Sequence, residues 1–231
     1  MQADTASTPR ARARAQLELD IIGVGREHLA QHGAAALSLR AIARDLGMVS
    51  SAVYRYVRSR DELLTLLVVD AYNESADRVA DALDATDHDA GVRDRLRVAA
   101  HALRTWAVAE PARFALIYGS PVPGYQAPAE QTTGPGTRFV AMLMTELSAT
   151  TVPADTTAPV PDTLAGEFGL VRDEFDLEVD DPTILVGTCL WSVILGSISL
   201  EVFGQYGADT FAQPEALFDL QLTTVLARLL P

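Results

Sequence analysis

The stretch "SLRAIARDLGMVSSAVYRYVRSRDELL", Ser38 to Leu64, constrains the fold more than any other part of this chain. Ser38 can cap a short helix that Gly47 ends, and Ser50 can cap a second short helix. The S-x-x-E pattern of Ser59 to Glu62 is a capping box that opens a longer helix. Two short helices joined by a glycine turn and braced by longer helices predict a helix-turn-helix.

The rest of the chain also shows apolar residues at helical spacing. Thr8 and Pro9 mark the start of a first helix and Gly33 its end, and the helix after Ser59 continues to about residue 84. No convincing run of alternating apolar and polar residues predicts a strand. We therefore predict an all-α fold, with a helix-turn-helix domain at 1–60, its bracing helix reaching about 84, and a larger helical domain at 85–231. Further helices are expected at 92–109, 112–118, 137–147, after Pro182 and at 214–230, with a loop at 119–136.

Positive charge is unevenly placed along the chain. The protein has no lysine, and residues 1–60 hold nine arginines against five acids, a net charge of +4. Residues 61–231 hold the other nine arginines against 26 acids, a net charge of −17. This asymmetry predicts a polyanion-binding module fused to an acidic body. The alternative is that the arginines only form ion pairs with the acids of the body.

The uncharged run 182–200 raises the question of a membrane span, because its 19 residues approach the length that one needs. Acidic residues flank it and it contains many small and polar residues, so a helix buried within the protein or between subunits is favoured. The single cysteine, Cys189, cannot form an intramolecular disulfide, and the N-terminus lacks the apolar core of a secretory signal. A cytoplasmic location and no membrane partner are expected.

Catalytic groups do not cluster in the sequence. His28 and His32 stand at metal-ligand spacing, but no third ligand accompanies them. His101 has no evident nucleophile partner, and Cys189 lies in an apolar run. We therefore predict no enzymatic activity, no metal and no cofactor.

The second short helix carries the residues that would contact DNA, because in a helix-turn-helix its N-terminal residues face the base edges. Ser50, Ser51 and Ala52 are small enough for close approach, and Arg55 is long enough to reach guanine. Two hydroxyls and a guanidinium, those of Tyr54, Tyr56 and Arg60, are suited to phosphate. Arg10, Arg12 and Arg14 form either a basic arm on the DNA or a solvated tail.

The motif "ALSLRAIARDLGMVSSAVYRYVRSRDELL", preceded by "AQHG", resembles the DNA-binding domain of the TetR family of bacterial transcriptional regulators. The resemblance implies that Ser38, Tyr54, Tyr56 and Arg60 hold phosphate, and that Ser50, Ser51, Ala52 and Arg55 read bases. This chain departs from the family pattern at three places: Tyr56 replaces a frequent histidine, Val57 a frequent phenylalanine and Arg60 the usual lysine.

Beyond residue 84 the resemblance implies a helical domain that forms a homodimer and holds a small-molecule cavity. "W-x7-F-x-L-x-Y-G-S-P", Trp106 to Pro121, resembles the C-terminal domain of a subset of these regulators. Candidate dimer residues on the helix after Pro182 are small, and those on the last helix are apolar: Thr188, Ser192, Gly196, Leu217, Leu220, Val225 and Leu229. The alternative is that both helices are only intrachain core.

Aromatic residues and a methionine supply the candidate ligand pocket, with the 119–136 loop as a candidate lid: Trp106, Phe114, Tyr118, Phe139, Met142 and Trp191. Aromatic residues at helical spacing are also common in cores, so each can instead be structural. The function expected from the resemblance is a repressor that binds operator DNA as a homodimer and is released by a small-molecule effector. The alternatives are an activator of the same family or a helical adaptor without DNA binding.

Overall fold

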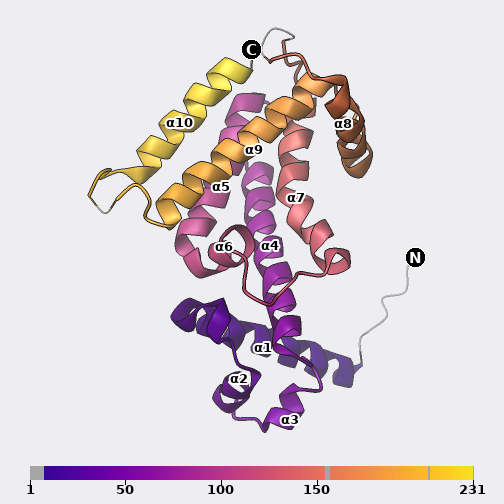
Figure 1. The fold of residues 1–231 in the computed structure, drawn as a ribbon, viewed down its shortest axis with the longest axis vertical. Helices are drawn as coiled ribbons and strands as arrows, with labels where there is room; N and C mark the ends of the chain where they lie inside the picture. The colour runs from indigo at the N-terminus through magenta and orange to yellow at the C-terminus, as the bar shows by residue number, and fades with distance from the viewer. Residues whose placement is uncertain (1–7, 154–156, 208, 231) are drawn as a thin grey trace. The chain divides into compact units, whose positions relative to one another are not determined.

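The computed structural model describes residues 8–153, 157–207 and 209–230, and these are helical without strands, as predicted (Figure 1). The helices in chain order are α1 (Pro9–His32), the 3-10 turn η1 (Ala34–Ala36), α2 (Leu39–Asp45), α3 (Ser50–Val53), α4 (Arg60–Asp84), α5 (Val92–Ala109), α6 (Pro111–Tyr118), α7 (Ala129–Ser148), α8 (Asp162–Phe175), α9 (Asp181–Val202) and α10 (Pro214–Leu229).

Side-chain caps fix the starts of several helices. Thr8 accepts a hydrogen bond from the Ala11 amide at 3.3 Å and begins α1, with Pro9 in the first turn. Ser38 caps α2, and the Ser59 hydroxyl accepts from the Glu62 amide at 3.0 Å at the start of α4. These side chains satisfy amides that have no partner within the helix. The predicted caps at these three positions are confirmed.

The predicted loop at 119–136 is too long. The helix α7 begins at Ala129 and includes Gly134, Pro135 and Gly136, so only 119–128 joins α6 to α7. A Cβ on Gly136 would lie 3.3 Å from the ring of Tyr72, which means that this glycine permits a close helix approach. The sequence pattern suggested a turn because glycine and proline usually mark one, whereas here packing decides their role.

Contacts divide the chain into two compact units, which we describe separately. The first contains residues up to Ala71 together with Ala112–Thr132, and the second contains Tyr72–Pro111 and the residues from Thr133 onward. The boundary predicted near residue 84 assigned all of α4 to the N-terminal domain. The contacts instead divide α4 after Ala71 and group α6 with the N-terminal helices.

The first unit has an aliphatic core to which α1, α2, α3 and the first turns of α4 contribute. The fully buried residues come at helical spacing from each helix, as the sequence pattern predicts. Burial of this set is the main force that holds the two short helices in place, since neither is long enough to be stable alone. The core residues are Ile21, Leu29, Leu37, Leu39, Ile42, Ala43, Val53, Val57, Leu63, Leu64 and Leu67.

One carboxylate joins three helices of this unit. Asp70 of α4 accepts hydrogen bonds from Arg26 of α1 at 2.7 Å and from Arg113 of α6 at 2.9 Å. Arg113 is 3% exposed and the Asp70 side chain 17% exposed, so both charges are largely removed from water. A buried charge of this kind is tolerated only when it is paired. The cluster therefore fixes α1 and α6 to the same turn of α4.

In the second unit, α9 packs against α5, α8 and α10, and α10 also packs against α5. Figure 1 shows α9 and α10 running side by side. Gly187 of α9 leaves room for the side chain of Met144 of α7, which a Cβ would strike. Ion pairs connect α5 to its neighbours, among them Arg95–Glu146 to α7, Arg104–Glu201 to α9 and Arg97–Asp219 to α10.

Replacement of Asp70 by alanine should destabilise the protein by about 3 kcal/mol, because it leaves the buried Arg113 guanidinium without this carboxylate. Glu18→Ala is the matched control, since the Arg14–Glu18 pair is exposed and lies within one helix. Such a pair contributes less than about 0.5 kcal/mol. Urea unfolding followed by circular dichroism measures the free energy of unfolding of both variants. Equal losses in the two variants would contradict the role given to Asp70.

Candidate nucleic-acid interface

The turn between α2 and α3 is shaped by Gly47, whose φ of 67° lies in the left-handed region that glycine adopts readily. The amide of Met48 donates to the carbonyl of Ala43 at 2.8 Å, and the amide of Gly47 donates to that of Arg44 at 3.0 Å. These bonds close the end of α2. Met48 then packs against the core of the first unit, which fixes the direction in which the chain enters α3.

The predicted cap at Ser50 is wrong. The extended residue before α3 is Val49, with φ −71° and ψ 139°, and it makes no side-chain cap hydrogen bond. Ser50 is the first helical residue, one position too late for its hydroxyl to act as the cap. The helix ends at Val53, so Tyr54, Arg55 and Tyr56 lie in the hydrogen-bonded turns that follow it.

The candidate base-reading residues lie along this short segment. Ser51 and Arg55 are exposed, whereas Ser50 and Ala52 are half-buried. Val53 and Val57, which have no exposed surface, anchor the segment from beneath. The Arg55 side chain makes no hydrogen bond or ion pair with any residue that the structure describes. The guanidinium of Arg55 is therefore available to a partner outside the chain.

The candidate phosphate-binding residues differ in how much of each side chain is available. Tyr54 is 43% exposed. The half-buried Tyr56 lies under the guanidinium of Arg14, whose carbon is 5.9 Å from the ring centroid. Ser38 is engaged as the cap of α2. Arg60 donates to the carbonyl of Ala34 at 2.9 Å and is 32% exposed, so it braces η1 as well as facing solvent.

The first turns of α1 belong to the same surface. Arg10, Arg12 and Arg14 are helical, so within the described residues they form neither an extended arm nor a tail. Arg10 and Arg14 line a groove of about 700 Å³ together with Arg55 and Tyr56. Sequence reasoning did not place Arg10 and Arg14 beside Arg55, because the two segments are far apart in the chain and meet only through the packing of α1.

A second polar contact braces the two N-terminal helices. His28 of α1 is buried, and its Nε2 lies 2.7 Å from Oδ2 of Asp45 on α2. The hydrogen bond with His28, assisted by Arg44, holds the pKa of Asp45 below its ordinary value of 3.8. His28 therefore connects α1 to α2.

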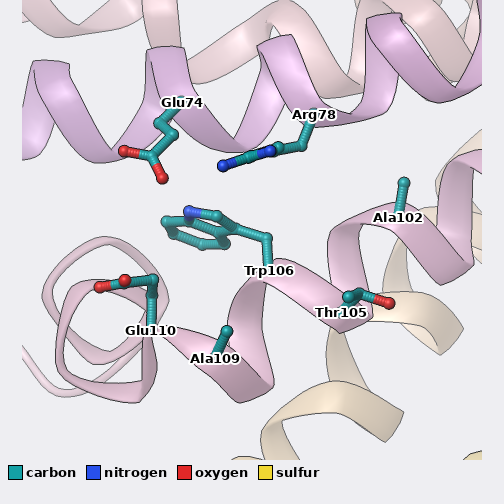
Figure 2. A pocket seen from close by; sticks show the side chains of 7 residues that line it. All are labelled: Glu74, Arg78, Ala102, Thr105, Trp106, Ala109 and Glu110. Carbon is teal, nitrogen blue, oxygen red and sulfur yellow. The ribbon is translucent and has the colours of Figure 1, made fainter.

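A pocket of about 420 Å³ lies in the second unit and is lined by α4 and α5. Figure 2 shows Glu74 and Arg78 of α4 directed toward the ring of Trp106, with Ala102, Thr105, Ala109 and Glu110 completing the lining. Its volume falls in the range of small-molecule sites. The lining combines an indole, three charged groups and a hydroxyl, which suits a ligand with both apolar and polar parts.

Of the six candidate pocket residues, Trp106 lines this pocket and the others lie elsewhere. Phe114 and Tyr118 belong to the first unit, where their ring centroids are 5.3 Å apart. Phe139 is buried in the second unit and Met142 is half-buried, while Trp191 lies on the exposed side of α9. Sequence reasoning missed Glu74 and Arg78, whose helical spacing gave no sign of a pocket.

The exposed sides of α9 and α10 form a groove of about 570 Å³. Four of the candidate dimer residues line it, namely Ser192, Gly196, Leu220 and Val225. Thr188 is also exposed, whereas Leu217 and Leu229 are half-buried. Leu220 is 65% exposed, so its apolar side chain faces solvent in this groove.

By length and composition alone, α9 could cross a membrane, and 44% of its most apolar window is buried inside the structure. It packs against three other helices of the second unit. A buried core helix passes the same test of length and hydropathy. The structure thus buries one side of α9 within the second unit and leaves the other side in the groove with α10.

A glycine turn between two short helices, with unpaired arginine beside it and a separate helical unit that contains a pocket, defines a helix-turn-helix transcriptional regulator. The chain belongs to the TetR family. The model of tetR family bacterial regulatory proteins matches residues 21–67, and that of the tetracycline repressor-like C-terminal domain matches residues 96–225. The family consists of DNA-binding regulators rather than enzymes, which confirms the prediction of no enzymatic activity.

Similar proteins agree with this assignment. The HTH-type transcriptional regulator Rv1816 of Mycobacterium tuberculosis is 50% identical over 221 residues, which cover 94% of each chain. The crystal structure of the regulatory protein SCO4313 is 34% identical and has a TM-score of 0.79, covering 95% of this chain and all of that one. A TetR variant from Acinetobacter baumannii, solved in complex with minocycline, shares the fold at 17% identity, with a TM-score of 0.53 and coverage of 90% and 92% of the two chains.

Proposed function

We propose that this TetR family regulator is a cytoplasmic repressor that binds operator DNA as a homodimer and is released by a small-molecule effector. The observation that carries DNA binding is the groove in which Arg55, which has no described partner, lies beside Arg10 and Arg14, in contrast with the arginines that connect α5 to its neighbours. Arg95, Arg97 and Arg104 of the second unit are paired with carboxylates. Arg40 and Arg55 of the helix-turn-helix are exposed and pair with no described residue.

The proposed DNA surface is the exposed side of α3 and the turns after it, together with the first turns of α1. Arg55 and the serines at the start of α3 supply base contacts, while Tyr54, Tyr56 and Arg60 supply phosphate contacts. We add Arg10 and Arg14, because they line the same groove as Arg55. The net charge of −17 on residues 61–231 repels DNA elsewhere and so favours approach through this surface.

Arg55→Ala should weaken operator binding about 10- to 100-fold, the range for loss of one bidentate base contact. Gel retardation of the region upstream of the protein's own gene measures the affinity, which should fall steeply as salt rises. Arg138→Ala is the control, because it removes the same charge from the second unit, where Arg138 pairs with Asp77. Equal weakening by both variants would mean that Arg55 contributes only net charge.

The direction of regulation has a separate readout. The retarded fragment, placed upstream of a reporter gene, should give less transcription when the protein is present. Increased transcription would identify an activator, and no retardation by the wild-type protein at low salt would favour the adaptor alternative.

The groove between α9 and α10 supports the proposed homodimer. Its small residues permit close helix approach, and its exposed Leu220 gains a partner when two copies meet about a two-fold axis. Two-fold symmetry would also match the two copies of the recognition segment, which we define as residues 49–56, to half-sites about 34 Å apart. The proposed dimer thus relates the apolar groove of the second unit to the spacing of the two operator half-sites.

Gly196→Glu should convert the dimer to a monomer without unfolding it. A Cβ at Gly196 meets nothing within 4 Å, so the chain itself accommodates a side chain there, whereas a partner helix would meet a buried charge. Gly166→Glu is the matched control, since this helical glycine of α8 is equally open. Sedimentation equilibrium at micromolar concentration distinguishes the two. A dimeric Gly196→Glu protein, or a monomeric wild type, would rule out this interface.

The pocket around Trp106 is the proposed effector site. It has a suitable volume, and α4 contributes residues both to this pocket and to the core of the first unit. The minocycline complex of the A. baumannii protein shows that a protein of this fold accommodates a small molecule. An effector that binds one conformer more tightly by about 1 to 3 kcal/mol is sufficient to change operator affinity measurably.

Ala102→Phe should fill the pocket and abolish release by effectors while leaving operator binding intact. A panel of metabolites and antibiotics is screened for release of fluorescent operator DNA from the wild-type protein. Each active compound is then tested on this variant and on Val108→Phe, an exposed position of α5 outside the pocket. Of the two variants, only Val108→Phe is expected to release the operator DNA when an active compound is added. Equal release from both variants would place the effector elsewhere.

A further inference from the structure

Val49 is the most exposed large apolar residue that the structure describes, with 71% of its surface accessible. It lies between Met48, which packs against the core, and Ser50, which begins α3. Hydrogen bonds from the amides of Gly47 and Met48 back to α2 fix the turn before it. The exposure of Val49 is therefore imposed by the backbone and is a fixed feature of the turn.

The same residue occupies a position where valine is a poor choice. Val49 is the N-cap of α3, and an N-cap is usually Ser, Thr, Asp or Asn, because their side-chain oxygens accept from a free amide. Thr8, Ser38 and Asp180 make the cap hydrogen bond at α1, α2 and α9, whereas Gly91, Pro161 and Gln213 make none at α5, α8 and α10. Val49 differs from these last three residues, because it alone has a branched aliphatic side chain. At α3, Val49 makes no cap hydrogen bond, and its side chain is not buried.

The DNA that the recognition segment would contact offers a chemical group that valine fits. Residues at the start of the second helix of a helix-turn-helix face the base edges in the major groove. The C5-methyl group of thymine is the apolar feature that a base presents there. We infer that Val49 contacts a thymine methyl group and is a specificity-determining residue for the operator. The inference rests on the proposed function, since it requires that α3 enters the major groove.

Thymine methyl deletion tests the contact directly. A duplex that the wild-type protein selects from a random pool is resynthesised with deoxyuridine replacing each thymine in turn, and affinities are measured by gel retardation. Loss of one apolar contact of a methyl group should weaken wild-type binding about fourfold at one position of each half-site. In Val49→Ala that position should become insensitive to deoxyuridine, while the other positions respond as in the wild type.

Val49→Ser separates recognition from stability. A serine restores the cap hydrogen bond, so this variant should melt at a higher temperature than the wild type yet lose the same methyl dependence. Leu19→Ala is the matched control, because Leu19 is 61% exposed on α1 and lies outside the recognition segment. It should keep the full wild-type pattern of deoxyuridine sensitivity.

The inference is overturned if Val49→Ala and Val49→Ser keep the methyl dependence of the wild type, or if no thymine in a bound operator shows one. Those results would leave the proposed function standing, because the wild-type protein would still bind the duplex. Failure of the wild-type protein to select or retard any duplex would overturn the proposed function, and the inference with it.

Discussion

The shared carboxylate of Asp70 fixes the positions of α1, α4 and α6 relative to one another, which the aliphatic core of the DNA-binding unit does not determine by itself. Its two arginines come from α1 and α6, so one buried charge connects segments that are far apart in the sequence. The aliphatic core could tolerate small shifts of these helices, because apolar contacts are not directional. The paired carboxylate of Asp70, which is 17% exposed, tolerates much smaller shifts of the helices, because a lost hydrogen bond leaves a buried ion. The positions of α1 and α6 against α4 are fixed in this way.

Arginine has two distinct roles in a protein that contains no lysine. Where carboxylates lie close, as beside Arg95 and Arg104, the guanidinium joins helices through bidentate pairs. Arg40 on α2 and Arg55 after α3 are exposed and have no described carboxylate partner, although Arg44 of α2 pairs with Asp45. The overall charge of −13 conceals this difference. What decides whether an arginine is available to DNA is the distribution of acids around it, which only the folded chain reveals.

The sequence predicted features that are determined locally. Caps at Thr8, Ser38 and Ser59 and the glycine turn depend on a few neighbouring residues, so the pattern was sufficient to identify the helix-turn-helix. Features that depend on tertiary packing were missed. The groove that contains Arg14 and Arg55 requires α1 to pack beside the recognition segment, and the pocket around Trp106 requires residues of α4 and α5 to come together. Helical periodicity identifies a buried side of each helix but does not reveal the gaps between helices.

The two clearest departures from local rules have different causes. Gly134, Pro135 and Gly136 lie inside α7, and the close approach of Tyr72 to Gly136 explains at least one of them within the chain. Val49 has no such explanation within the chain, since its side chain is neither packed nor hydrogen-bonded. Because Val53 and Val57 anchor the segment from beneath, α3 keeps its position without an optimal cap. The cap position is thereby free to be selected for what it contacts on DNA. Local rules fail most informatively at sites of this kind, where a residue is tuned to a partner outside the chain.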